Sequence, residues 1–231
     1  SILLLSQVNT GKVLLRMSPD IQSSHLRLRQ TIGILGLLLP ILVYVFHREF
    51  LASISHYYYT DSNVFFIVII SAFGFFLISY RGYPATKEEW LSDDSITTIG
   101  GMGALLLILF PTCCEGSESE IIDCLDIPLP FFGISSKVSN IIHFSGAGVF
   151  IFSVACMSYF KFTLGKPDGK HQLYRVSGII IWICLLVLLI ETLIGKSFTD
   201  YDTFIFETIA VFAFGISWVV KGKVLEFETI I

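Results

Sequence analysis

The stretch NVFFIVIISAFGFFLISYRGYP, residues 63–84, decides the fold of this chain. Its part from 63 to 80 carries no charge and is long enough to cross the apolar core of a bilayer as a helix. It ends in YRGYP, where tyrosine and arginine favour the membrane–water interface and the glycine and proline stop the helix. The stretch therefore predicts a transmembrane helix that ends at the cytoplasmic face.

Five further apolar segments extend this pattern along the chain. The sequence is 54% hydrophobic with a mean hydropathy of +0.76, which is too apolar for a soluble domain of 231 residues. Inside a bilayer the backbone must satisfy its own polar groups, so each segment is expected to be a helix. We therefore predict an all-α polytopic membrane protein with six transmembrane helices, at about 32–46, 63–80, 96–111, 138–160, 176–194 and 203–220.

The basic residues predict how this bundle is oriented. If the N-terminus is cytoplasmic and the spans alternate, only Arg48, Lys137 and Lys196 of the 15 Lys and Arg residues lie outside. This bias follows the positive-inside rule with both termini in the cytoplasm. The expected organisation is a cytoplasmic segment 1–30, a transmembrane domain 31–222 and a cytoplasmic tail 223–231, in a plasma membrane of the bacterial inner-membrane type.

The first residues do not have the pattern of a signal peptide, because their apolar run is short and no small-residue cleavage site follows. Met17 is a reasonable translation start. Residues 1–16 are then either an upstream extension or a cytoplasmic tail.

The predicted outer loop at 112–136 is acidic and contains three of the five cysteines. If it lies on an oxidising side of the membrane, we expect a disulfide between Cys124 and either Cys113 or Cys114. The loop is also a candidate surface for a protein partner. Membrane lipids are the other expected partners, nucleic acid is not expected, and the sequence leaves the oligomeric state open.

Polar residues in and beside the spans share one depth. His143 lies about five residues inside the outer start of the fourth span, with Asn140 one turn outside it, and Glu207 lies about four residues inside the sixth. Glu191 is near enough to the interface to be solvated. Ionisable groups within a membrane are costly and usually face a protected cavity. We therefore expect a polar cavity open to the outer leaflet, lined by His56, Tyr58, Asp61, Asn63, Asn140, His143 and Glu207.

Three kinds of chemistry suit these residues. His56, His143, Asp61 and Glu207 are acceptable zinc ligands, although no H-x-x-x-H or H-E-x-x-H motif places two of them on one helical face. His143 and Glu207 could instead form a metal-free acid–base pair. The third alternative is a cavity that binds a lipid head group or small molecule, or that couples helices by hydrogen bonds.

Several short motifs resemble a known group of membrane proteins. The chain has an S-x-Y-Y-x-T segment at 55–60, F-L-x-x-Y-R-G-Y at 76–83, IIHFSGAGVFIF at 141–152 and FETIAVFAFGISWVVKG at 206–222. This order is similar to uncharacterised bacterial six-span proteins and, more distantly, to the superfamily of damage-regulated autophagy modulators and GPI-anchor remodelling proteins. The resemblance covers about residues 30–222 and implies a six-helix bundle with a role in membrane lipids, with residues 53–63, His143 and Glu207 at the positions that recur.

The functional expectation is that the cavity binds a lipid or amphiphile. A lipid hydrolase or acyltransferase, with or without a metal, is the enzymatic alternative, with His143 and Glu207 as its catalytic residues. A structural or sensory subunit that meets a partner through the acidic loop is a third class. The absence of a charged path through the inner half of the predicted spans disfavours a transporter.

Overall fold

A computed structural model describes residues 19–82, 91–112, 135–164, 169–195 and 198–223. These residues are helical and contain no strand, which confirms the prediction of an all-helical fold. The long helices are α1 (Pro19–His47), α2 (Asn63–Ser79), α3 (Asp93–Leu109), α4 (Ser136–Cys156), α5 (Lys170–Ile194) and α6 (Asp202–Lys223). A 3-10 helix, η1 (Ile54–Tyr59), follows α1, and a π-helical turn, η2 (Met157–Lys161), continues α4.

Four of the long helices have the length and composition of membrane-spanning elements. Four stretches are long and apolar enough to cross a bilayer: Ser24–His47, Lys137–Lys161, Lys170–Ile194 and Asp202–Gly222. α2 is a shorter apolar helix of 17 residues. Large hydrophobic side chains also cover the outside of the bundle, among them Phe152, Ile183 and Leu186, each more than half exposed. Because so extensive an apolar surface is unfavourable in water, the chain is a membrane protein.

Two helices begin earlier than their predicted spans. α1 starts at Pro19 rather than near residue 32, and α5 starts at Lys170 rather than near 176. Charged residues ended the predicted spans because lipid excludes them, but Arg, Lys and Gln are good helix formers and let the helix continue into the polar region. Proline is also well suited to the first turn of α1, where its missing N–H is not needed.

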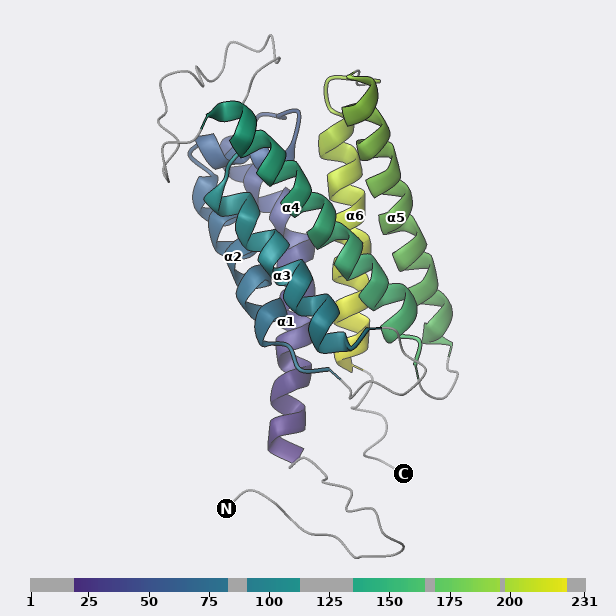
Figure 1. The fold of residues 1–231 in the computed structure, drawn as a ribbon. Coiled ribbons are helices and arrows are strands. Elements are labelled where there is room, and N and C mark those ends of the chain that lie inside the picture. Colours follow the sequence, from purple (N-terminus) through teal and green to yellow (C-terminus); the bar gives the residue numbers. More distant parts are fainter. Residues whose placement is uncertain (1–18, 83–90, 113–134, 165–168, 196–197, 224–231) are drawn as a thin grey trace, which may run out of the picture.

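The helices form one bundle in which α6 lies beside α1 (Figure 1). The most extensive contacts join α1 with α6, α2 with α3, α3 with α4, and α5 with α6. α1 begins and α6 ends at the same end of the bundle (Figure 1). The opposite end carries η1 and the first turns of α4 and α6, and we call it the η1 end.

Glycines allow the helix backbones to touch. A Cβ atom on Gly103 of α3 would lie 2.7 Å from the carbonyl oxygen of Gly146 in α4, and one on Gly33 of α1 would lie 2.7 Å from that of Gly215 in α6. Neither pair has room for any larger side chain. The glycines of α3 and α4 therefore form small-residue faces that pack against each other.

Candidate functional site

The segment between α1 and α2 folds over the η1 end of the bundle. Ser53 caps η1, and its hydroxyl oxygen accepts a 3.1 Å bond from the backbone N–H of Ser55. Tyr57 is fully buried, and its hydroxyl donates to the Glu49 carbonyl at 2.7 Å. Tyr57 is therefore a core residue that fixes the turn after α1, whereas Tyr58 and Tyr59 are only half-buried.

Glu207, on the second turn of α6, is held by this segment. The Ser53 hydroxyl donates to both carboxylate oxygens, at 2.9 and 3.1 Å, and the backbone N–H of Ile54 donates to one of them at 2.7 Å. A further backbone bond, from the Phe204 N–H to the Ala52 carbonyl at 2.9 Å, joins the same two elements. The carboxylate that the sequence singled out is thus bound to the start of η1.

His143 of α4 is 2% exposed, and both of its ring nitrogens have partners. Nδ1 lies 3.0 Å from the carbonyl oxygen of Phe110, at the end of α3, and Nε2 lies 3.0 Å from the hydroxyl oxygen of Ser55. Because a carbonyl can only accept, Nδ1 must carry the proton. In the neutral ring Nε2 is then the acceptor, so the Ser55 hydroxyl donates to it.

These bonds form one continuous series, which we call the polar chain. It consists of Glu207, Ser53, Ser55, His143 and the carbonyl of Phe110, and it joins α6, η1, α4 and the end of α3. His143 and Glu207 thus belong to one network, as their shared depth suggested, but Ser53 and Ser55 lie between them. In the polar chain, the hydroxyl of Ser55 lies at the basic nitrogen of His143. The other ring nitrogen is oriented by a backbone carbonyl.

Two other predicted residues lie beside the polar chain. His56 is near enough to His143 for their rings to interact electrostatically, and burial lowers the pKa of His56 below its ordinary value of 6.5. Asn140 accepts a 3.2 Å bond from the hydroxyl of Thr112, and the Tyr59 hydroxyl donates to the Thr112 carbonyl at 2.7 Å. Asn140 therefore helps to hold the end of α3 against α4.

The remaining predicted residues lie elsewhere on the η1 end. Asp61 is exposed and its carboxylate lies 2.9 Å from Nδ1 of His47, a residue of α1 that the sequence did not single out. Asn63 is exposed at the start of α2. Tyr58 packs edge-on against Tyr59, and burial raises the pKa of its hydroxyl. None of these three side chains bonds to His143 or Glu207 among the contacts of the described residues.

The described residues bear on the predicted metal site but not on the predicted disulfide. Within the described ranges, no group of three or more His, Cys, Asp or Glu side chains comes together that could hold a metal ion. Cys113, Cys114 and Cys124, and most of the acidic loop, lie outside the described residues. Cys156 and Cys184, which the structure does describe, are free thiols.

Sequence reasoning missed Ser53 and Ser55 and misplaced Glu191. Serine is common at helix caps and loops, so neither residue type nor spacing marked the two serines as partners of an acid and a histidine. Glu191 was expected to be solvated, but it is 7% exposed and lies against Asp202 at the start of α6. The expectation was wrong because the start of α6 covers this face of α5.

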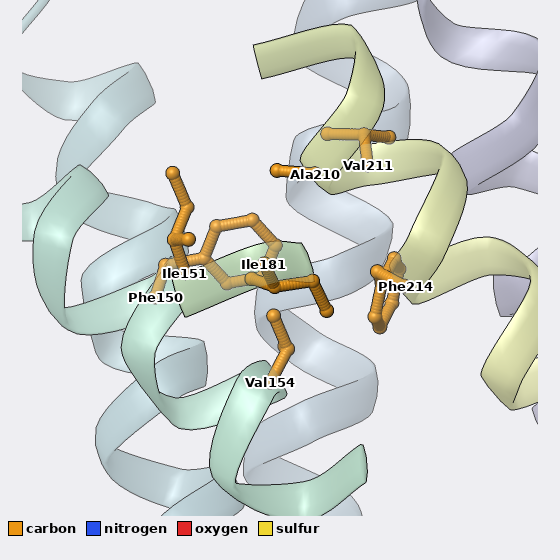
Figure 2. Close-up of a pocket in the computed structure, with 7 residues that line it drawn as sticks. All are labelled: Phe150, Ile151, Val154, Ile181, Ala210, Val211 and Phe214. Carbon is orange, nitrogen blue, oxygen red and sulfur yellow. The ribbon is translucent and has the colours of Figure 1, made fainter. Parts of the chain in front are cut away.

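A groove and a small cavity lie along the helices that carry Glu207 and His143. An open, hydrophobic groove of about 390 Å³ runs along the η1-end half of α6, and Phe50 contributes to its lining. Thr208 also lines the groove, and its buried hydroxyl has no hydrogen-bond partner among the described residues. A second, narrow cavity of about 10 Å³ lies between α4, α5 and α6, one to two turns inward of Glu207 and two to three turns inward of His143. Figure 2 shows its lining residues, Phe150, Ile151, Val154, Ile181, Ala210, Val211 and Phe214.

Comparison with known proteins adds no relative to this description. No protein-family model, curated protein or solved structure matches the chain.

Proposed function

We propose that this chain is an integral membrane protein of six transmembrane helices that binds a lipid or amphiphile at its η1 end. Both termini are cytoplasmic in this proposal, so the η1 end faces the outer side of the membrane. The membrane is the plasma membrane, which in a bacterium is the inner membrane. The observation that carries the proposal is the groove along α6. Its volume of about 390 Å³ lies in the range of small-molecule sites.

The shape and lining of the groove suit an acyl chain. It is lined by Phe50, Tyr201, Phe204, Ile205, Thr208, Ile209 and Phe212. Ile205 and Ile209 are 48% and 41% exposed, so the groove is open on a surface that a bilayer would cover. A lipid tail is the occupant that such a surface meets, and the groove would bury it without removing any polar group from water.

The segment that carries the serines of the polar chain also contributes to the groove. The segment that begins with Phe50, which lines the groove, continues directly into Ser53 and Ser55, whereas the Thr208 hydroxyl is buried beneath the apolar lining. The resemblance to six-span lipid-related proteins agrees with this assignment and forms part of the proposal.

Photo-crosslinking tests the proposal. The full-length protein in nanodiscs is given a diazirine-bearing phospholipid, and the labelled peptides are identified by mass spectrometry. Labels are expected to concentrate on residues 201–212, and Ile209→Trp, which fills the groove, should reduce them several-fold. Ile183→Trp is the matched control, because Ile183 is similarly exposed on α5 but lies outside the groove.

Labels spread evenly over all lipid-facing helices, or unaffected by Ile209→Trp, would contradict the proposal. The chain would then be better explained as a structural or sensory subunit. In that case the acidic loop at 112–136, which carries several carboxylates and no basic residue, is the surface to examine for a protein partner.

A further inference from the structure

We propose that Ser55 is a nucleophile activated by His143, and that the polar chain is an acyl-transfer site for a membrane-dissolved ester. The inference deepens the proposed function and rests on it for the substrate class. Its basis is the geometry around His143, where the hydroxyl oxygen of Ser55 lies 3.0 Å from Nε2. A nucleophile within hydrogen-bond reach of a base, with the base oriented by a third group, is the arrangement that activates serine.

The carbonyl of Phe110 determines which nitrogen of His143 can act as the base. Because the carbonyl of Phe110 holds Nδ1 in its protonated form at 3.0 Å, Nε2 faces Ser55 with its lone pair free to take a proton. A backbone carbonyl orients the ring here, where other serine sites use a carboxylate.

Glu207 acts as a positioning residue. Its carboxylate binds the Ser53 hydroxyl and the Ile54 N–H, and the Ser53 oxygen in turn accepts from the Ser55 N–H. These bonds fix the first turn of η1 over α6 and α4. The Ser55 side chain is held toward His143 as a result, without any contact between Glu207 and the reacting atoms.

The chemical steps balance without a metal or redox partner. As the Ser55 oxygen attacks the ester carbonyl carbon, Nε2 of His143 takes the hydroxyl proton. The tetrahedral intermediate collapses with cleavage of the ester C–O bond, and the imidazolium gives its proton to the departing alkoxide, which leaves as an alcohol. Water, or a second alcohol, then attacks the acyl-serine with His143 again as base, and Ser55 recovers its proton as the acid or new ester departs.

Burial decides which esters can react. Ser55 is 5% exposed and His143 is 2% exposed, so a water-soluble ester has no direct path to them. Phe50, which lines the groove, belongs to the same segment as Ser55, so a ligand in the groove contacts the segment that carries the nucleophile. A long-chain ester seated in the groove is therefore the substrate class, and the restricted access of water favours transfer of the acyl group to a second alcohol over hydrolysis.

An alkyl fluorophosphonate with a long chain tests the assignment on the full-length protein in detergent or nanodiscs. The probe phosphonylates an activated serine, and mass spectrometry identifies which one. We expect the label on Ser55, its loss in Ser55→Ala, and a 10²- to 10⁴-fold slower reaction in His143→Gln. Ser62 and Ser217 are internal controls, because both are completely buried and hydrogen-bonded but have no histidine partner.

The wild-type result alone decides the proposal, whatever the variants do to folding. Absence of label from Ser55, or equal label on Ser62 and Ser217, would overturn the acyl-transfer site. If lipid crosslinks still concentrate on residues 201–212 in that case, the lipid-binding proposal stands and the Ser55–His143 bond is structural. If Ser55 is labelled but the crosslinks do not concentrate there, the activity stands and the groove is not its substrate site.

Discussion

The hydroxyl of Ser53 bonds to both carboxylate oxygens of Glu207, at 2.9 and 3.1 Å, although 154 positions of sequence separate the two residues. This contact joins the loop before α2 to the last helix of the bundle. It also sets the position of η1, because Ser53 is the cap of that helix and Ile54, its first residue, donates to the same carboxylate.

Replacement of Glu207 by alanine should therefore loosen η1 from α6. The change leaves the Ser53 hydroxyl and the Ile54 N–H without their acceptor, and each unsatisfied buried group costs about 1–3 kcal/mol. Glu207→Gln keeps one acceptor oxygen and should lose less. Thermal unfolding in detergent and limited proteolysis at residues 48–62 measure the two effects. Equal stability of Glu207→Ala and the wild type would show that the contact has no structural role.

The contact between α3 and α4 predicts a difference between two glycines of the same helix. A Cβ on Gly146 would lie 2.9 Å from the Gly103 carbonyl oxygen, whereas one on Gly148 would meet no atom within 4 Å. Gly146→Ala should destabilise the protein by about 1–3 kcal/mol through overpacking. Gly148→Ala should be neutral or slightly stabilising, because alanine is the better helix former. Unfolding in SDS compares the two variants, and equal losses would mean that the helices do not cross at Gly146.

His56 predicts a dependence of stability on pH. Burial lowers its pKa in the folded protein below the ordinary value of 6.5, so the unfolded chain binds the proton more readily. The contribution of neutral His56 to stability is therefore complete above pH 6.5 and is lost as the pH falls from 6.5 toward the folded pKa. Melting temperatures measured between pH 5 and 8 should fall more steeply on the acid side for the wild type than for His56→Gln. Parallel curves would contradict this assignment.

The architecture was readable from the sequence because the apolar segments are long and uninterrupted. The predicted span at 63–80 coincides with α2, Asn63–Ser79, to within one residue. Depth was informative as well. Because His143 and Glu207 lie at similar distances from the same face, both meet the loop that folds over that face, and the structure places them in one network.

The detailed partners were not readable because they depend on how the loop after α1 turns. His47 bonds to Asp61 only because the chain reverses near Arg48, the one non-glycine residue with positive φ in the described part of the chain, at 68°. Ser55 faces His143 only because Ser53 caps a 3-10 turn that points it there. Tyrosine is common at membrane interfaces, so residue type alone does not reveal that Tyr57 fills the core.

A buried ion pair at the end opposite η1 gives the last prediction. Lys161 ends η2 on the predicted cytoplasmic side, and its side chain is 6% exposed and lies 3.5 Å from the similarly buried carboxylate of Asp93. Removal of one partner leaves a buried charge uncompensated, so Lys161→Met or Asp93→Asn alone should cost about 3–5 kcal/mol, and the double variant should recover much of that loss. Arg81→Ala is the control, because its pair with Asp94 is 3.6 Å long and exposed, and such pairs contribute little. Unfolding in SDS across the four variants measures the coupling, and additive losses in the double variant would show that Lys161 and Asp93 do not act as a pair.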